Sequence, residues 1–111
     1  MIIGYQDFAR VEIRVGTVVS ARPNDAARNP AYVLEIDFGP EIGIKRSSAQ
    51  LTELYTTAEL IGRQVAAVIN FPPKQIARVL SEVLVLGFPD EQGRVVLIGV
   101  DRKVPDGGRL F

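Results

Sequence analysis

The sequence predicts an all-β domain, a five-stranded Greek-key barrel with one short helix and an extension at each end. Three observations support this prediction. Short apolar segments with period-two alternation recur along the chain, at the spacing of strands in small barrels. Clusters of Gly, Pro, Asn and Asp separate these segments. Helical periodicity is confined to residues 49–62, between the third and fourth predicted strands.

The first predicted strand covers residues 11–22 and follows an opening that predicts a short turn or helix. Alternate residues of this strand share one face at period two, namely Ile13, Val15, Thr17 and Val19. Gly16 lies inside the strand and predicts a bend or bulge. Such a device lets one strand serve two sides of a small barrel.

The second and third predicted strands follow a turn-rich segment, residues 23–31. They cover residues 32–38 and 42–48, with Gly39-Pro40 between them. Alternation in the second strand predicts inward Leu34, Ile36 and Phe38, and outward Val33, Glu35 and Asp37. In the third strand, one face carries Ile42, Ile44 and Arg46, and the other carries Lys45 and Ser47.

The remaining elements complete the barrel. A short helix is predicted over residues 58–61, capped by Thr57 and ended by Gly62. The later strands are predicted at residues 64–69, 82–87 and, after a hairpin turn at 90–93, 94–100. One helix between the third and fourth of five strands is typical of the oligonucleotide/oligosaccharide-binding (OB) fold. Another small β-barrel or a sandwich is the alternative.

Residues 70–81 join the fourth strand to the fifth and are predicted to form a stiff loop. Pro72 and Pro73 have no N–H for a sheet ladder, so they lie outside any central strand. The loop therefore displays Lys74 and Arg78 beside the start of the fifth strand. Polar residues at the mouth of an apolar scaffold are typical of a functional site.

The composition limits the kinds of function that the chain can have. The 111 residues are predicted to form one domain, 1–111. Without Cys or His, the chain has no disulfide, no thiolate nucleophile and no zinc site built on those ligands. Its 13 basic and 13 acidic side chains balance, which argues against strong, diffuse binding of nucleic acid. With no signal peptide and no apolar stretch of about 20 residues, the chain is predicted to be cytoplasmic, without membrane insertion.

Candidate catalytic residues are few. Glu35 and Asp37 share a strand face, as in an acid/base pair or a cation site, and equally as on the solvated face of an antiparallel strand. No Ser lies in a nucleophile elbow, and no glycine-rich loop is present to hold a phosphate. The sequence therefore predicts a protein that is not an enzyme and that has no cofactor and no metal.

The residues of the loop 70–81 have two interpretations each. Asn70 either reaches a ligand or caps a turn. Phe71 either stacks on a nucleic-acid base or plugs the barrel end, and Lys74 and Arg78 either meet phosphates or only keep the loop soluble. The same ambiguity applies to the strand-end hydroxyls of Ser47, Ser48 and Ser81.

Both ends of the chain are apolar, with Met1-Ile2-Ile3 at one end and Leu110-Phe111 at the other. Terminal residues that fray in water are usually polar. A monomer exposes these apolar residues, whereas a dimer buries both sets around a two-fold axis. The sequence therefore predicts a homodimer with its termini in the interface.

Four segments of the chain, taken together, resemble the CsaA family of small bacterial and archaeal proteins described as secretion-related chaperones. These segments are residues 11–18, 41–52, 70–74 and 81–87, in this order. The family lies within a wider group of tRNA-binding domains, which includes the C-terminal domain of methionyl-tRNA synthetase and the endothelial monocyte-activating polypeptide. The resemblance implies an OB barrel and homodimers built through the terminal extensions.

The wider tRNA-binding pattern matches this chain at five positions, namely Ser47, Asn70, Pro73, Ser81 and Glu82. It departs at four others: the pattern has basic residues in place of Pro72 and Ala77, Gly in place of Arg78 and Met in place of Leu84. Two cations are lost and one is gained, which predicts weaker engagement of phosphates and hence weak, shape-directed binding of tRNA.

Two functions therefore remain open from the sequence. As a tRNA-binding module, the chain would use a polar and cationic set, namely Lys45, Arg46, Ser47, Ser48, Asn70, Lys74, Arg78, Ser81 and Glu82. As a chaperone, it would bind unfolded or export-bound polypeptides along an apolar set, namely Phe71, Ile76, Val79 and Leu80. These four residues suit a hydrophobic core equally well.

Overall fold

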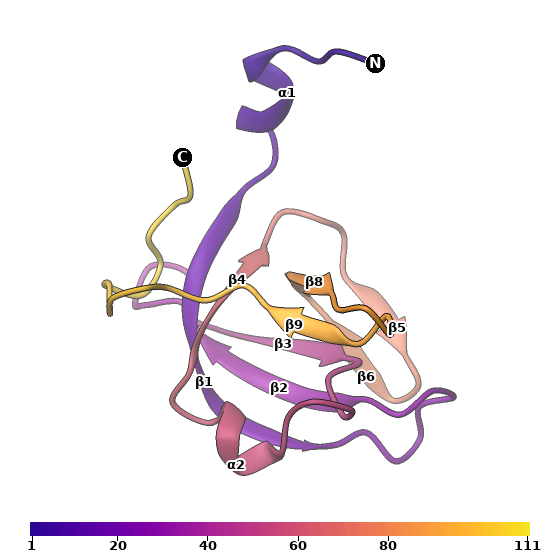
Figure 1. Cartoon of the computed structure of the whole chain (residues 1–111). Coiled ribbons are helices and arrows are strands. Elements are labelled where there is room, and N and C mark those ends of the chain that lie inside the picture. The colour runs from indigo at the N-terminus through magenta and orange to yellow at the C-terminus, as the bar shows by residue number, and fades with distance from the viewer.

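A computed structural model describes all 111 residues, and most of the chain forms a strongly curved antiparallel barrel (Figure 1). Five strands are hydrogen-bonded in the order β3-β2-β1-β4-β7, and two further hairpins, β5–β6 and β8–β9, follow β4 and β7. The predicted all-β, OB-like barrel is confirmed, with its short helix between β3 and β4. The elements are α1 (Tyr5–Ala9), β1 (Ile13–Pro23), β2 (Tyr32–Asp37), β3 (Ile44–Ala49), α2 (Thr57–Leu60), β4 (Gln64–Val68), β5 (Lys74–Ile76), β6 (Val79–Ser81), β7 (Leu84–Val85), β8 (Gly87–Pro89) and β9 (Val95–Leu97).

The long strand β1 serves both sides of the barrel. Residues 13–17 pair with β4 and residues 17–23 pair with β2, with a register shift at Val19. A bulge is therefore present in this strand, but its predicted position is wrong: it lies at Val19, whereas Gly16 pairs in regular register with Val65 of β4. Gly16 itself is buried, and a Cβ there would lie only 2.6 Å from Ile36 and 2.8 Å from Phe38. The residue is needed for the close approach of β1 to the side chains of β2.

The core lies inside this barrel. Its nine buried residues are Val18, Leu34, Ile36, Phe38, Leu51, Leu60, Val65, Ala67 and Val83. The inward positions predicted for β2 are confirmed, but the outward position of Val33 is wrong, since this side chain is only 1% exposed. Val33 lies opposite Ser48 in β3, and the backbone of Ser48 is bonded to Ser81 of β6. This bond joins β3 to the β5–β6 hairpin.

The helix α2 starts one residue earlier than predicted. Thr56, not Thr57, is the N-cap, because its hydroxyl accepts a hydrogen bond from the Glu59 backbone N–H at 3.2 Å. The Glu59 carboxylate in turn accepts from the Thr56 N–H at 3.0 Å, and these bonds hold the pKa of Glu59 below its ordinary value. Gly62 ends the helix as predicted, at a φ of 90°.

The segment after β4 differs most from the prediction. Residues 74–81 are not a stiff loop but a β-hairpin, which turns at Ala77 with a φ of 53°. The predicted fifth strand at 82–87 is reduced to β7, and the chain then enters the β8–β9 hairpin. The turn of that hairpin lies at residues 90–93, as predicted. Desolvation by itself would raise the pKa of Asp90. Three hydrogen bonds from Arg94 and Gln92 outweigh this effect, so the pKa of Asp90 is lowered.

The two ends of the chain both meet the barrel at β1 (Figure 1). The arm, residues 1–11, carries α1 and stands away from the barrel (Figure 1). The tail, residues 103–111, returns along β1, where the Gly107 and Leu110 N–H groups donate to the carbonyls of Val15 and Ile13. Neither helix has the length and apolar character that a membrane crossing requires.

Candidate binding cleft

A cleft of about 350 Å³ opens at the rim of the barrel, between the β5–β6 hairpin and the start of β7. Apolar and polar side chains both line it: Ser48, Phe71, Pro72, Lys74, Ile76, Ser81, Glu82, Val83 and Leu84. Its volume lies at the low end of the range of small-ligand pockets. The cleft therefore accommodates a few side chains of a larger partner or a small ligand.

The register of the β5–β6 hairpin decides which residues face the cleft. Lys74 lies opposite Ser81, and Ile76 lies opposite Val79, so all four share one face of the hairpin. Val79 is buried beneath the cleft, at 8% exposed. Leu80 belongs to the other face, where it is 47% exposed and does not line the cleft.

The side chains of Ser81 and Glu82, in the wall of the cleft, are hydrogen-bonded to the edge strand β3. The outward N–H groups of Ser48 and Arg46 donate to Ser81 Oγ at 3.0 Å and to Glu82 Oε1 at 3.1 Å. The Glu82 N–H donates back to the Arg46 carbonyl at 2.8 Å. Ser81 and Glu82 thus take the place of a neighbouring strand along β3, in a contact that we call the seam. The seam closes the barrel and fixes one wall of the cleft.

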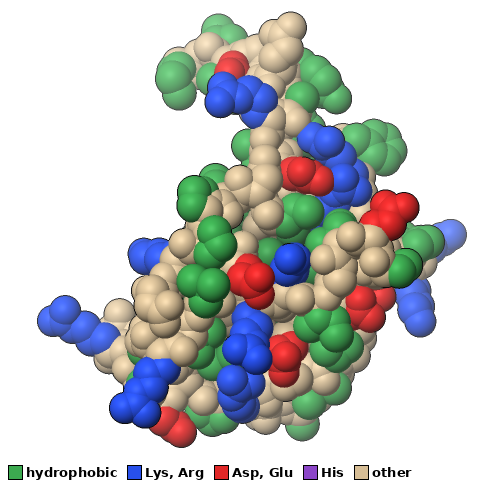
Figure 2. All heavy atoms as spheres, turned by 180° about the vertical axis from the view of Figure 1, so that it is seen from behind, with side chains coloured by type: hydrophobic (Ala, Val, Ile, Leu, Met, Phe, Trp, Pro, Cys, Tyr) green, Lys and Arg blue, Asp and Glu red, His purple; other side chains and the backbone are tan.

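Two cations at the rim have no acidic partner. Lys74 and Arg78 are both exposed, and no carboxylate lies within 4.0 Å of either charge. Lys45 and Arg46, by contrast, lie 4.0 Å from Glu82 and 3.9 Å from Glu35, the long contacts of weak surface pairs. Figure 2 shows cationic and acidic side chains interspersed on the face opposite to that of Figure 1. No continuous basic surface is formed there.

The structure gathers only part of the sequence-predicted site. The cleft contains Ser48, Phe71, Lys74, Ile76, Ser81 and Glu82. It leaves out Lys45, Arg46, Ser47, Asn70, Arg78, Val79 and Leu80. Ser47 is 1% exposed inside the barrel, so its contact with a ligand stays a prediction that its burial argues against. The Asn70 side chain is bonded to the Arg10 carbonyl of the arm and to the N–H of Glu12, just after it.

Sequence analysis missed Leu84, which lines the cleft and is 50% exposed. Leu84 follows the cleft residues Ser81 and Glu82 closely in the sequence, and this closeness was the available signal. Phe71, at 51% exposed, does not plug the barrel end. An exposed aromatic and an exposed aliphatic side chain therefore flank the cleft.

A second cavity, of about 460 Å³, lies between α1 and the tail. We call it the notch, and it is lined by Tyr5, Phe8, Ala9, Val11, Arg109, Leu110 and Phe111. Six of these seven residues are hydrophobic. Figure 2 shows hydrophobic side chains around the projecting arm, well away from the barrel.

The carboxyl groups whose pKa is shifted lie outside the cleft. The two carboxyl groups with a shifted pKa, Glu59 and Asp90, belong to the α2 cap and to the β8–β9 turn. Glu35 lies 3.9 Å from Arg46, and Asp37 accepts from the Gly39 N–H at 2.8 Å. Barrel, cleft and notch together define a small OB-type binding domain.

The comparison with protein families agrees with this class. The family described as "Putative tRNA binding domain" matches residues 13–109. Crystal structures of chaperone CsaA from Bacillus anthracis and of the CsaA chaperone protein from Picrophilus torridus are 47% and 46% identical to the chain, with TM-scores of 0.93 and 0.92. They cover 100% and 99% of this chain and are themselves covered completely. The chain therefore belongs to the tRNA-binding domain family and, within it, to the CsaA proteins.

Larger proteins share the same domain. The methionine–tRNA ligase of Methanosarcina acetivorans is 32% identical over 108 residues, which are 97% of this chain and 15% of the ligase. That of Flavobacterium johnsoniae is 29% identical over 98% of this chain, again 15% of the ligase. The chain thus spans about a seventh of the length of these curated relatives.

A protein of about the same length also shares the fold. The MetRS-related protein from Pyrococcus horikoshii is 25% identical to this chain with a TM-score of 0.88, covers the whole chain and is itself 99% covered.

Proposed function

We propose that the protein is a non-catalytic, cytoplasmic chaperone that binds apolar segments of unfolded or export-bound polypeptides in the cleft. One observation carries this proposal: half-exposed Phe71 and Leu84 flank a cleft that has Ile76 on its wall. Large apolar side chains that are held exposed around a concavity are typical of a surface that receives a partner. The similarity to two structures described as CsaA chaperones supports the same function.

The charged residues of the cleft complement this apolar surface. Lys74 projects from the same hairpin face as Ile76, and one oxygen of Glu82 is not used by the seam. An extended segment presents apolar side chains and free backbone groups together, so a cleft with both kinds of contact fits it without reading one sequence. Low selectivity is what a chaperone for varied clients requires.

Pairing of two chains through arm and tail is the second part of the proposal. Ile2, Ile3, Leu110 and Phe111 are all at least 47% exposed, and the apolar notch lies among them. A homodimer that buries this surface presents two clefts on one particle. Two weak sites on a single particle bind a long client much more tightly than one site does.

A weak affinity for tRNA is the second candidate function, and the unpaired Lys74 and Arg78 favour it. The family match to tRNA-binding domains supports it as well. A purely tRNA-binding module without a chaperone role is the alternative. Two free cations on a chain of zero net charge make few phosphate contacts, so the affinity is expected to be low and sensitive to salt.

The dependence of binding on salt concentration distinguishes tRNA from an unfolded peptide as ligand. Between about 50 and 200 mM salt, retention of tRNA is expected to fall steeply, whereas capture of an unfolded apolar peptide holds or strengthens. Lys74→Ala should lower the slope of log affinity for tRNA against log salt by about one. Lys103→Ala, which removes an equally exposed cation of the tail, should leave that slope unchanged. Absence of peptide capture at every salt concentration would contradict the chaperone function.

A further inference from the structure

We propose that Asn70 is a positioning residue that fixes the direction of the arm for pairing with a second copy of this chain. The resemblance to tRNA-binding domains places Asn70 among the ligand contacts, but the structure gives its amide another use. The proposal rests on the homodimer of the proposed function. Its test is nevertheless chosen so that the two can fail separately.

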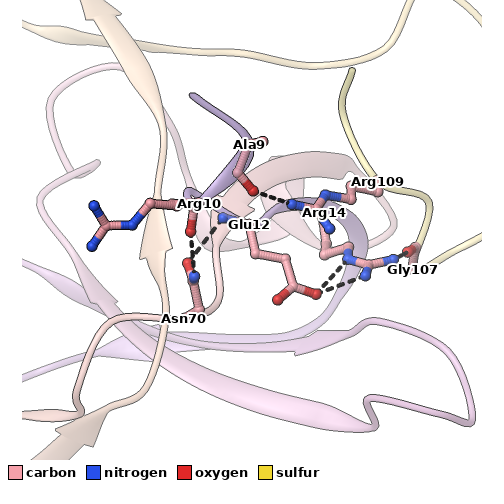
Figure 3. Close-up of polar contacts among 7 residues, drawn as sticks. All are labelled: Ala9, Arg10, Glu12, Arg14, Asn70, Gly107 and Arg109. Carbon is pink, nitrogen blue, oxygen red and sulfur yellow. Dashed lines mark hydrogen bonds and ion pairs between the residues drawn. The ribbon is translucent and has the colours of Figure 1, made fainter. Parts of the chain in front are cut away.

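Both ends of the Asn70 amide are bonded to the neck between α1 and β1 (Figure 3). Its Oδ1 accepts from the Glu12 N–H at 2.9 Å, and its Nδ2 donates to the Arg10 carbonyl at 2.7 Å. Asn70 thereby holds two backbone groups two residues apart, as a neighbouring strand would do. One amide hydrogen and one lone pair of Oδ1 are left for any other partner.

Two arginines hold the same neck from its other side (Figure 3). Arg109 of the tail donates to the Ala9 carbonyl at 2.6 Å. Arg14 of β1 bonds the Glu12 carboxylate at 2.6 Å and the Gly107 carbonyl at 2.9 Å. Two segments distant in sequence, the residues that follow β4 and the tail, therefore meet the chain at residues 9–12, just before β1.

The arm needs this support because its own structure is weak. The helix α1 has five residues and buries none of them. A helix of this length is not stable by itself in water. Without the bonds at its neck, the arm would sample many directions, and pairing of two notches would first have to order it at a cost in entropy. The bonds to Asn70 and Arg109 remove part of that cost before pairing.

The position of Asn70 also explains how it can be mistaken for a ligand contact. Phe71, the next residue, lines the cleft. A change at Asn70 that disrupts pairing would halve the number of clefts per particle and lower the apparent affinity for a long client through lost avidity alone. The test must therefore separate arm order, pairing and intrinsic binding.

The direct readout of arm order is tryptic cleavage after Arg10, an exposed residue whose carbonyl is held by Asn70. In Asn70→Ala, cleavage of the Arg10–Val11 bond should be about tenfold faster than in the wild type, at a protein concentration low enough for a monomer. Arg109→Ala, an exposed tail residue outside the cleft, should accelerate the same cleavage. Lys74→Ala, a change in the cleft, should not.

Pairing and binding complete the test. Asn70→Ala should raise the dimer dissociation constant by about tenfold or more in analytical ultracentrifugation, because the bonds are lost in both subunits. Its affinity for a short apolar peptide, which occupies one cleft, should stay within about twofold. Arg109→Ala should likewise raise the dimer dissociation constant and leave the affinity for the short peptide unchanged. If Asn70→Ala does not fold, Arg109→Ala serves as the test of the proposal.

The outcomes are distinct. Unchanged cleavage after Arg10 in Asn70→Ala overturns the positioning role, and so does a loss of short-peptide or tRNA affinity that matches Lys74→Ala with pairing intact. A wild-type chain that stays monomeric refutes the proposed homodimer. Faster cleavage after Arg10 would still establish that Asn70 orders the arm.

Discussion

The two ends of the molecule expose apolar side chains in different settings. At the cleft, Phe71 is 51% exposed, and Lys74, a cation without an acidic partner, belongs to the same lining. At the notch, Phe111 is fully exposed, and the one cation in the lining, Arg109, is already bonded to the Ala9 carbonyl. The cleft mixes hydrophobic residues with an unpaired cation and a carboxylate, whereas six of the seven residues that line the notch are hydrophobic.

This difference separates the kinds of partner that each end suits. Permanent interfaces between identical subunits are the more apolar ones, while transient interfaces keep polar and charged groups among their contacts. The notch therefore fits a second copy of the chain. The cleft fits ligands that come and go, and the free charge near it adds a term that depends on salt.

The largest effect is expected at the notch. Replacing both Leu110 and Phe111 by Ser removes two apolar side chains from each subunit of the proposed dimer, and the dissociation constant should rise by about 100-fold or more. Phe88→Ser, which removes an exposed aromatic side chain of β8, is the control and should keep the dimer. Sedimentation over a concentration series measures both. An unchanged dissociation constant in the double variant would place the interface elsewhere.

A smaller effect is expected at the seam. Ser81→Ala removes the acceptor of the Ser48 N–H and should lower the free energy of unfolding by about 1–3 kcal/mol. Ser20→Ala, in β1, is the control and should change it by less than about 0.5 kcal/mol. Urea unfolding measures both values. Equal stability of the two variants would show that the seam does not hold the cleft wall.

The sequence predicted the barrel well because alternation and turn residues are local signals. The inward residues of β2, the helix end at Gly62 and the turn at 90–93 all follow from such signals. Val33 escaped prediction because alternation within one strand does not show whether its outer face is also covered. The hairpin itself was hidden because Ala77 occupies a left-handed position for which the sequence offers no Gly or Asn.

The candidate site was predicted only in part, for a related reason. Phe71, Lys74, Ser81 and Glu82 lie close together in sequence, so a local argument places them together. The role of Asn70 depends on the arm, about 60 residues away, and no local pattern indicates it. The seam is equally hidden, because it joins β3 to side chains more than 30 residues later.

The most direct test of the account compares two exposed phenylalanines, Phe71 at the cleft and Phe88 on β8. Phe71→Ser should weaken binding of an unfolded apolar peptide by about tenfold, the effect of losing roughly 1.4 kcal/mol of apolar contact, and should reduce protection of an aggregating client. Phe88→Ser should leave both unchanged, although that side chain is the more exposed of the two. Fluorescence titration of the peptide against each variant gives the measurement. The same affinity for both variants would contradict the assignment of polypeptide binding to the cleft.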